Sequence, residues 1–551
     1  MTVVFFSWGY TMKREFLFPV RVIKCFGDVQ HADALLREKS LQIGLTEPDC
    51  VVLQNNGGEQ AGILLDFGKE LCASVRILTH VTSERKQVRV HVTCGESVSE
   101  VLSRIGEKNA TNDHAIRDTD YRLPAYSDMT LNETGFRFVC IRLLEEDASV
   151  SIKAVVAASV RRDLPYLGSF RCSNDTLNRI YDTAAYTCHL CLQSYIWDGI
   201  KRDRLVWVGD IHPEMLTVRT VFGPLPLVED TLALIREATP LPGWMNRYPT
   251  YSLWWMIIVR DWYFYTGNGA FLADNRDYVL DLTEQILAQV NEDGSDNLPK
   301  YFLDWPTNKT EAGVQGSRAL LVLALEAAAE LCTLFDADAL SDTCRMRIEI
   351  LRKASWNADT AKQTLAFTAL AGCCDEQEAA EKILRDGAAG FSTFMSYYLL
   401  KVAAKKDMAA TLRVLEEYYG AMLRLGATTF WEDFNMEWAE NAAPIDREPL
   451  EGEQDVHGDY GAYCYRGFRH SLCHGWSSGP TAFLAEEVLG IRVTAAGCRK
   501  VELCPNLGDL DWAEGTYPTP LGVLSVRCER KDDGTVKTTW QAPDGMEVIC
   551  S

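Results

Sequence analysis

Residues 197–214 read Trp-Asp-Gly-Ile-Lys-Arg-Asp-Arg-Leu-Val-Trp-Val-Gly-Asp-Ile-His-Pro-Glu, and the rest of the chain is arranged around them. Asp198, Asp203, Asp210 and Glu214 stand here among four basic side chains and two tryptophans. Carboxyl groups can bind hydroxyls or transfer protons, and indole faces stack on the apolar side of a sugar ring. The alternative is an exposed, salt-bridged turn ahead of a helix. The long helical region that follows favours a sugar site.

This helical region begins at an N-cap cluster, Ser173-Asn-Asp-Thr176, which is followed by apolar residues at helical spacing such as Leu177 and Ile180. Helical periodicity then continues for about three hundred residues and indicates about twelve helices, one of them after Pro213. Twelve helices joined by loops of varied length predict an (α/α)6 barrel, in which loops at one end build the site. A helical solenoid is the alternative, but the region shows no fixed repeat.

Both flanks of the helical region alternate apolar and polar residues, which is the pattern of strands. Before about residue 165 the alternation is seen in Val88–Thr93, Phe138–Leu144 and Val150–Val156. After about Ile491 it returns in three short runs, Val501–Pro505, Gly522–Arg527 and Val536–Trp540. We find no chemistry in the first flank beyond surface polarity.

The predicted fold is therefore multidomain and mainly α. An N-terminal β-sandwich (1–165) precedes the (α/α)6 barrel (166–490), and a small C-terminal β-sandwich (491–551) follows it.

Composition excludes several function classes. The 551 residues are 47% hydrophobic, and 55 basic against 77 acidic residues give a formal charge of −22. No Lys/Arg stripe is present, so we expect no nucleic-acid partner. The negative electrostatic field of the protein suits a neutral carbohydrate substrate better than a polyanion. A homo-oligomer is compatible with the sequence.

Eighteen scattered cysteines, several at apolar helical positions, indicate a reduced protein. Cys188 and Cys191 have a zinc-like spacing, but no second pair follows, so core packing is the favoured interpretation and we predict no metal. No cofactor is predicted either, because no phosphate-cradling glycine loop is found. Residues 1–10 do not resemble a signal peptide, and Ala319–Leu331 is too short and too charged to span a membrane. We expect a cytoplasmic protein without membrane contact.

The chain resembles the bacterial α-L-rhamnosidases, inverting glycoside hydrolases whose (α/α)6 barrel lies between β-sandwich domains. The likeness spans roughly residues 165–530 and includes the C-terminal strands. It rests on four segments in the family's order, which are 198–210, Leu303-Asp-Trp305, Gly426-Ala-Thr-Thr-Phe-Trp-Glu432 and Arg469-His-Ser-Leu-Cys-His474. The third is the most specific.

The resemblance implies that Asp203 is the general acid and Glu432 the general base. It also implies that sugar is bound by a further set of residues, namely Asp198, Arg202, Trp207, Asp210, Asp304, Trp305, Trp431 and His474. Inverting hydrolysis needs one protonated carboxyl at the glycosidic oxygen and one carboxylate that holds water on the opposite face. We expect Asp203 to carry the raised pKa, because Asp198 and Asp210 crowd it with like charge. For most tryptophans, packing in the barrel core is the simpler interpretation.

Two departures from the family pattern bear on function. Many members have Glu where this chain has Asp203, which is one methylene shorter; Glu214 and Glu437 are the nearest alternative acids. Residues 252–256 read Ser-Leu-Trp-Trp-Met where the family has an acid-bearing Trp-Gly-Asp, which affects the choice of sugar. A glycosidase or lyase for another sugar, or a non-catalytic sugar-binding relative, are the other hypotheses.

The segment 448–469 forms a long polar and aromatic stretch before the last predicted helix. It is either a lid over the leaving-group side or a surface excursion. For His457 we favour a hydrogen-bonded structural role, and for His474 we favour binding of sugar hydroxyls.

Overall fold

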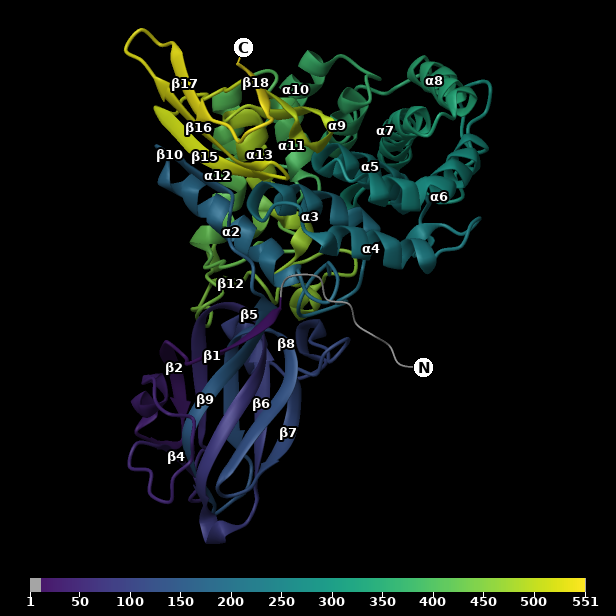
Figure 1. The fold of residues 1–551 in the computed structure, drawn as a ribbon. Helices are drawn as coiled ribbons and strands as arrows, with labels where there is room; N and C mark the ends of the chain where they lie inside the picture. Colours follow the sequence, from purple (N-terminus) through teal and green to yellow (C-terminus); the bar gives the residue numbers. More distant parts are fainter. Residues whose placement is uncertain (1–10, 551) are drawn as a thin grey trace.

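The computed structural model describes residues 11–550, and the expectation about the N-terminal ten residues lies outside them. A sheet domain, a helical region and a second group of sheets follow one another along the chain (Figure 1). The predicted multidomain order, with a helical core between β-rich parts, is confirmed.

The N-terminal sheet domain holds nine strands in one sheet, whose main path is β3-β4-β9-β5-β8-β6-β7. β1 pairs with β9 and β2 pairs with β5, and all the pairings are antiparallel. Residues facing inward form their own apolar core, which includes Ile63, Leu65, Val90 and Ile141. The strands are β1 Met12–Leu17, β2 Arg21–Phe26, β3 Asp28–Gln30, β4 Val51–Gln54, β5 Gly62–Thr82, β6 Val88–Gly95, β7 Asp118–Leu123, β8 Ser127–Leu143 and β9 Ser149–Arg162, with helix α1 Val98–Leu102 after β6.

Twelve further helices occupy the middle of the described chain. They are α2 Asp175–Cys191, α3 Val208–Val221, α4 Pro226–Glu237, α5 Pro249–Thr266, α6 Gly269–Leu287, α7 Glu311–Leu334, α8 Asp338–Arg352, α9 Lys362–Leu370, α10 Glu376–Leu384, α11 Ser396–Ala403, α12 Met408–Arg424 and α13 Pro480–Phe483. The predicted cap at Asn174 is confirmed, since its side chain accepts hydrogen bonds from the first-turn amides of α2.

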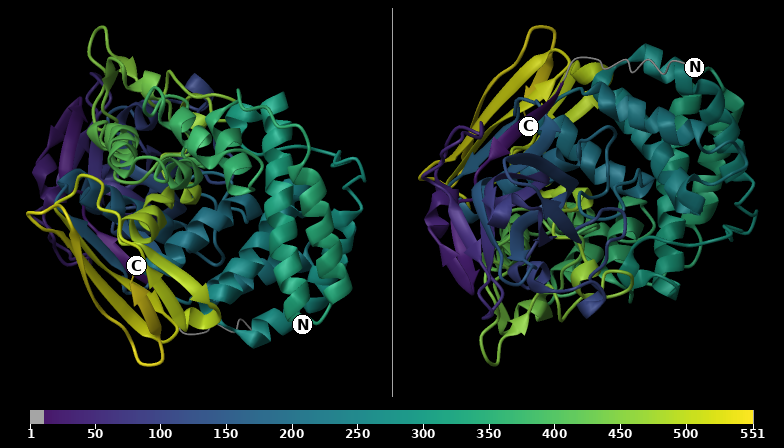
Figure 2. Two further views of the ribbon diagram at one scale, coloured as in Figure 1. Left: turned by 90° about the horizontal axis from the view of Figure 1, so that it is seen from above. Right: turned by 90° about the horizontal axis from the view of Figure 1, so that it is seen from below.

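Alternate helices of this region touch one another in a closed series. α3 contacts α5, α5 contacts α7, α7 contacts α9, α9 contacts α11, α11 contacts α13, and α13 contacts α3 again. The intervening helices lie against this series, as α6 and α8 do on α7 and α10 does on α9 and α11 (Figure 2).

The prediction that a helix starts after Pro213 is wrong, because α3 begins at Val208 and contains the proline. Proline removes one intrahelical hydrogen bond, which a helix tolerates when packing holds it elsewhere. Nearly every residue of α3 is buried, so packing supplies that support.

Two small sheets end the described chain. β10 Ser169–Cys172, β15 Trp512–Thr519, β16 Gly522–Arg530 and β17 Val536–Gln541 form one sheet, and β13 Ile491–Ala495, β14 Lys500–Leu503 and β18 Glu547–Cys550 form another. β10 comes from the start of the helical region and pairs with β15. The apolar core is continuous from the helices into these sheets and includes Val501 and Leu524.

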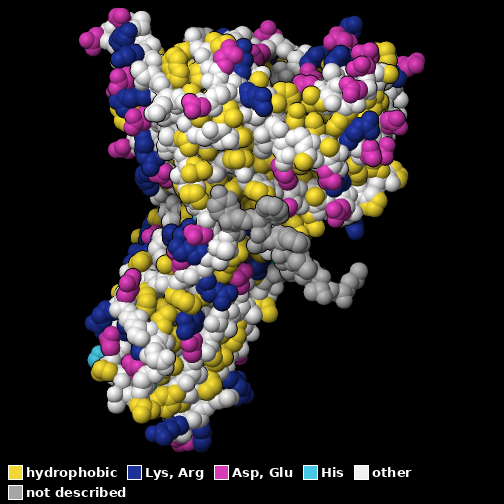
Figure 3. All heavy atoms as spheres, viewed as in Figure 1, with side chains coloured by type: hydrophobic (Ala, Val, Ile, Leu, Met, Phe, Trp, Pro, Cys, Tyr) yellow, Lys and Arg dark blue, Asp and Glu magenta, His cyan; other side chains and the backbone are white. Residues whose placement is uncertain are grey.

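The surface carries no large region of one charge on the face seen in Figure 3, where acidic and basic side chains are interspersed. Within residues 11–550, none of the helices combines the length and apolar character that crossing a bilayer requires. Cys188 and Cys191 are buried in the protein core. Burial raises the pKa of the Cys188 thiol, and a hydrogen bond with Cys473, followed by burial, raises the pKa of the Cys191 thiol. Core packing is therefore what the structure shows for this pair.

Candidate active site

The loop between α2 and α3 folds back on itself and presents the acidic stretch. The Asp198 amide donates to the Leu205 carbonyl at 3.0 Å, and the Leu205 amide donates to Asp198 Oδ1 at 2.9 Å. Between them Asp203 and Arg204 adopt left-handed backbone, with φ of 55° and 54°. Such conformations are uncommon outside glycine and persist where the surroundings hold them. The turn is thus held in a shape that displays Arg202 and Asp203.

Arg202 joins the two predicted catalytic carboxylates. Its Nη1 donates to Asp203 Oδ1 at 3.1 Å, and its Nη2 donates to Glu432 Oε1 at 2.5 Å. Its Nε donates to the Arg469 carbonyl at 3.0 Å, and the guanidinium lies over the Tyr465 ring. A planar guanidinium can hold two carboxylates in a fixed relation, which an ammonium cannot. Asp203 and Glu432, which are 229 positions apart in the sequence, are both held by the Arg202 guanidinium.

Glu432 is held rigidly. Its Oε2 accepts from the Ser471 amide at 3.1 Å, and its own amide donates to the Ser471 carbonyl at 3.0 Å. The Trp476 indole and the Thr393 hydroxyl both donate to its carbonyl oxygen. The carboxylate itself is almost fully buried. This arrangement orients one carboxylate towards Arg202 and His474.

His474 lies among three of the predicted acids. Its Nε2 is 3.4 Å from Glu432 Oε1, 3.7 Å from Asp198 Oδ2 and 3.9 Å from Asp210 Oδ1. Burial lowers the pKa of His474 well below its usual value, so the ring is neutral and does not compensate these charges. Its Nδ1 is buried without a hydrogen-bond partner among the described residues.

Asp198 and Asp210, which lie in the same stretch as Asp203, both have raised pKa values. Burial, and after it the neighbouring Asp210 carboxyl, raises the pKa of Asp198 well above its usual value. Burial and then Glu432 do the same for the pKa of Asp210. These groups have few partners and a large desolvation cost, a state that hydroxyl groups of a ligand would relieve.

Asp304 and Asp433 form a second acidic pair beside Glu432. Ser392 Oγ donates to Asp304 Oδ2 at 2.5 Å, and burial raises the pKa of Asp304 to about 6. Burial, followed by the Asp304 charge, raises the pKa of Asp433 to about 7. Beside Asp304, the Trp305 ring stacks on Tyr463 with centroids 5.6 Å apart. An aromatic wall therefore adjoins the acids, with Tyr463 reaching it from the 448–469 segment.

The predicted tryptophans differ in exposure. Trp207 and Trp305 are half-buried, whereas Trp431 is 1% exposed and packs edge-on against Phe434 and His470. Trp254, Trp255 and Trp262 are also fully buried, in keeping with a core role for most tryptophans.

Tyr251 of α5 was not among the predicted site residues, although it contacts Trp207 edge-on at 6.0 Å. Its ring lies where a Cβ on Gly209 would come within 2.8 Å, so the glycine of the opening stretch is needed for close packing. Burial and then the Asp210 charge raise the pKa of Tyr251 well above its usual value. No spacing in the sequence ties α5 to this loop.

The alternative acids are placed differently. Glu214 is fully buried, and neither carboxylate oxygen has a hydrogen-bond partner among the described residues. It presses against Gly475, where any Cβ would overlap Oε1. Burial raises the pKa of Glu214 well above its usual value, with Cys191 and Asp210 contributing. Glu437 lies in a short 3-10 turn, Met436–Ala439, and its amide donates to the Asn435 side chain.

The N-terminal sheet domain contributes to the site, which corrects the expectation that it carries no chemistry. His114, from the loop before β7, has Nε2 3.3 Å from Asp203 Oδ1. Glu96, at the end of β6, accepts from the Leu472 amide at 2.7 Å and from Ser471 Oγ at 3.2 Å. These contacts arise from domain packing, and no periodicity or motif in the sequence signals them.

Next to the site, Lys201 lies buried between the sheet domain and the helices, in a cluster with Glu96 and Glu100. Its Nζ lies 2.8 Å from Glu96 and 3.2 Å from Glu100, and it donates to two carbonyl oxygens. Glu96, Glu100 and His457 are close enough to one another to be considered as metal ligands. The Lys201 ammonium already supplies the positive charge there, which argues against a metal ion.

The structural role predicted for His457 is confirmed. Its Nδ1 bonds to Ser97 Oγ at 2.8 Å and its Nε2 to the His470 carbonyl at 2.9 Å. Nearby, Lys108 pairs with Asp455 and Asp459. One part of the 448–469 segment therefore docks on the sheet domain, while Tyr463 and Tyr465 reach the site.

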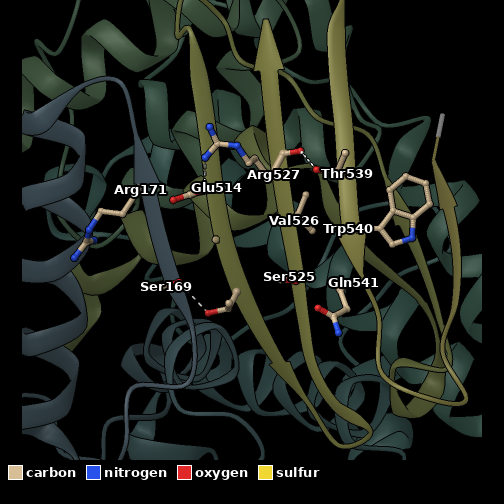
Figure 4. A pocket seen from close by; sticks show the side chains of 11 residues that line it. Ser169, Arg171, Glu514, Ser525, Val526, Arg527, Thr539, Trp540 and Gln541 are labelled. Carbon is tan, nitrogen blue, oxygen red and sulfur yellow. Dashed lines mark hydrogen bonds and ion pairs between the residues drawn. The ribbon is translucent and has the colours of Figure 1, made fainter.

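A separate hollow lies on the C-terminal sheet, formed by β10, β15, β16 and β17 (Figure 4). Arg527 pairs there with Glu514 and Glu529, so its charge is compensated. In Figure 1 this sheet lies on the opposite side of the helical region from the N-terminal sheet domain, which the acidic site adjoins.

The sequence and the fold were compared with those of known proteins. Residues 165–358 match the family model described as the bacterial α-L-rhamnosidase six-hairpin glycosidase domain. This part of the helical region is therefore similar to the bacterial α-L-rhamnosidases. The matched residues contain the opening acidic stretch and Asp304, whereas Glu432 and His474 lie beyond them. No curated protein matches the chain.

Several solved structures share the fold of this chain. A GH78 rhamnosidase of Bacillus sp. GL1 is 24% identical, with a TM-score of 0.73 over 92% of this chain and 54% of its own. The α-L-rhamnosidase of Streptomyces avermitilis complexed with L-rhamnose is 17% identical, with a TM-score of 0.70 over 89% of this chain and 48% of its own. The rhamnosidase from Klebsiella oxytoca with rhamnose bound is 17% identical, with a TM-score of 0.64 over 86% of this chain and 96% of its own. The chain spans about half the length of the Bacillus and Streptomyces proteins.

Proposed function

We propose that the protein is a glycoside hydrolase that removes a terminal α-L-rhamnosyl residue from a glycoside or oligosaccharide, with inversion at the anomeric carbon. The observation that carries this proposal is the fixed pair Asp203 and Glu432, held on two nitrogens of Arg202. Asp203 and Arg202 lie within the residues that match the rhamnosidase family model. The Streptomyces enzyme is complexed with L-rhamnose and the Klebsiella enzyme has rhamnose bound, which supports the choice of sugar.

The two carboxyl groups have environments that suit different tasks. Glu432 is buried and held by the Ser471 amide, and as general base it would take a proton from the attacking water. Asp203 is the more accessible, with a side chain 20% exposed, and as general acid it would give its proton to the glycosidic oxygen. Arg202 contacts the two carboxyl groups through different nitrogens and so fixes their relative position. Inverting enzymes place these groups about 6.5–9.5 Å apart.

We assign the remaining polar residues to the sugar. Asp198, Asp210 and His474 would bind hydroxyl groups, because burial has left them with few partners of their own. Trp207 and Trp305 would form half-buried walls against the apolar face of the ring. Trp431 would support the site from behind, since it is fully buried.

We also propose the finer architecture. The closed series of α3, α5, α7, α9, α11 and α13, with the other helices lying outside it, supports an (α/α)6 barrel over residues 166–490. The nine-stranded sheet with its own core supports a β-sandwich over 1–165, and the two small sheets support a second one over 491–551, joined by β10.

The test is release of p-nitrophenol from the α-L-rhamnoside by wild type, Asp203→Asn and Glu432→Gln, beside a panel of other aryl glycosides. Wild type should cleave the rhamnoside, and both folded variants should lose activity. For Glu432→Gln we expect a loss of about 10²- to 10⁴-fold, the usual range for a general base. Cleavage of another sugar through the same two residues would change the substrate and keep the mechanism. A wild type that binds L-rhamnose but hydrolyses no glycoside would contradict the enzymatic proposal.

A further inference from the structure

One residue near Asp203 comes from outside the family domain. His114 lies in the loop between the 3-10 turn Glu107–Asn109 and β7, far from the helical region in sequence. Its Nε2 is 3.3 Å from Asp203 Oδ1, the oxygen that Arg202 also contacts. Because a carboxylate oxygen only accepts, the ring nitrogen must carry a proton for this contact to be attractive. The contacts of His114 and Arg202 with Asp203 are thus both made to Oδ1.

The loop that carries His114 is fixed at both ends. Asn112 Oδ1 accepts from the amides of Arg117 and Asp118, and Asp113 pairs with Arg469. His114 has φ of 67°, so both partners of the contact adopt left-handed backbone. Backbone of this kind is kept where surrounding contacts determine it, and here Arg469 ties the loop to the segment that leads to His474.

The contact bears on the substitution of Asp for Glu. An aspartate side chain is shorter than a glutamate by one methylene and reaches less far towards a glycosidic oxygen. The Asp203 carboxyl must therefore be held in the correct orientation to transfer its proton. Two donors on Oδ1 leave Oδ2 to carry the transferable proton. Arg202 supplies one donor from the barrel, and the sheet domain supplies the other.

We propose that His114 is a positioning residue for Asp203, and that the leaving-group side of the site is shared between the N-terminal sheet domain and the helical domain. This inference rests on the proposed glycosidase function. The step it supports transfers the Asp203 proton to the glycosidic oxygen as the bond from that oxygen to the anomeric carbon breaks. The aglycone leaves as a neutral alcohol, and Glu432 accepts the proton of the attacking water.

The leaving group distinguishes this role from a structural one. A good leaving group such as 2,4-dinitrophenolate departs without protonation, whereas an alkyl alcohol requires the acid. His114→Ala should therefore lower kcat/KM for alkyl rhamnosides by about 10- to 100-fold. It should change the rate for the dinitrophenyl rhamnoside by less than about threefold. His114→Gln, which keeps a donor at similar reach, should recover part of the loss.

His31→Gln is the matched control, because His31 is an exposed histidine of the same domain with φ of 57°. This variant should behave as wild type with every leaving group. An equal loss by His114→Ala across the series, or no loss at all, would overturn the inference while wild-type activity leaves the proposed function standing. A wild type inactive on all the rhamnosides would overturn the proposed function and this inference with it.

Discussion

Lys201 and Arg202 are neighbours in the chain and are both buried, yet they serve two different clusters. The Lys201 ammonium has two carboxylates and two carbonyl oxygens around it, and this cluster is fully enclosed between two domains. Arg202 also contacts two carboxylates, but one of them, Asp203, is partly open to solvent. Beyond Arg202 lie Asp198 and Asp210, with which the neutral His474 forms no compensating pair.

The difference shows how a structural ion cluster can be told from a reactive one. Around Lys201 the charges are paired, and a group removed from such a cluster costs stability. Near Arg202, the only basic side chain that Asp198 and Asp210 face among the described residues is the neutral His474, so these buried carboxyl groups lack the cation that Glu96 and Glu100 have. Two neighbouring basic residues therefore differ in role: Lys201 stabilises the fold, and we propose that Arg202 supports catalysis.

The largest effect on stability is expected from Lys201→Met. This change leaves Glu96 and Glu100 buried without their cation, which should lower the free energy of unfolding by about 3–5 kcal/mol. The loss should be seen as a clearly lower Tm in differential scanning calorimetry. Lys86→Met is the control, because Lys86 pairs with Glu84 on the exposed surface, and its Tm should stay near that of wild type. Equal Tm values for the two variants would contradict the structural role of the Lys201 cluster.

Arg202→Lys should have the converse effect. The ammonium keeps the charge but cannot hold Asp203 and Glu432 on two nitrogens, so kcat/KM on the α-L-rhamnoside should fall by about 10- to 100-fold while Tm changes little. Arg204→Lys is the matched control, since Arg204 stands in the same loop and pairs with Glu133 instead. If both variants keep wild-type kinetics, the bridging role of Arg202 is wrong.

A smaller effect concerns Asp433 and depends on pH. Because the pKa of Asp433 is raised to about 7, the folded protein holds a proton that the unfolded chain releases above about pH 4. The stability that this proton contributes is present below pH 4 and is lost as pH rises through about 7. Asn cannot titrate, so the Tm of Asp433→Asn relative to wild type should rise between pH 5 and pH 8. A difference that falls or stays constant would contradict the raised pKa; exposed Asp277→Asn serves as the control.

The order of sheet, helices and sheets could be predicted because each part buries one face, and burial imposes a period on the sequence. The exact ends of the helices are harder to predict from the periodicity of apolar residues. α6 begins at Gly269, where the Asn268 side chain caps the amides of Ala270 and Phe271. Polar capping leaves little trace in a hydrophobic pattern.

The helical part of the site could be anticipated for a different reason. Asp198, Asp203 and Asp210 stand in one stretch, and the segments of Glu432 and His474 resemble family motifs, so local sequence carried the information. Glu96 and His114 belong to strands and loops whose sequence looks like ordinary surface. Only the packing of the sheet domain against the helices brings them to Lys201 and Asp203.

The central claim, hydrolysis through Asp203 and Glu432 on opposite sides of the bond, is tested most directly by the configuration of the first product. Proton NMR during cleavage of an α-L-rhamnoside would show which anomer of rhamnose forms before mutarotation. A water held by Glu432 attacks from the face opposite the leaving group, so β-L-rhamnose should appear first and the α anomer should grow in later. Initial release of α-L-rhamnose would contradict this account.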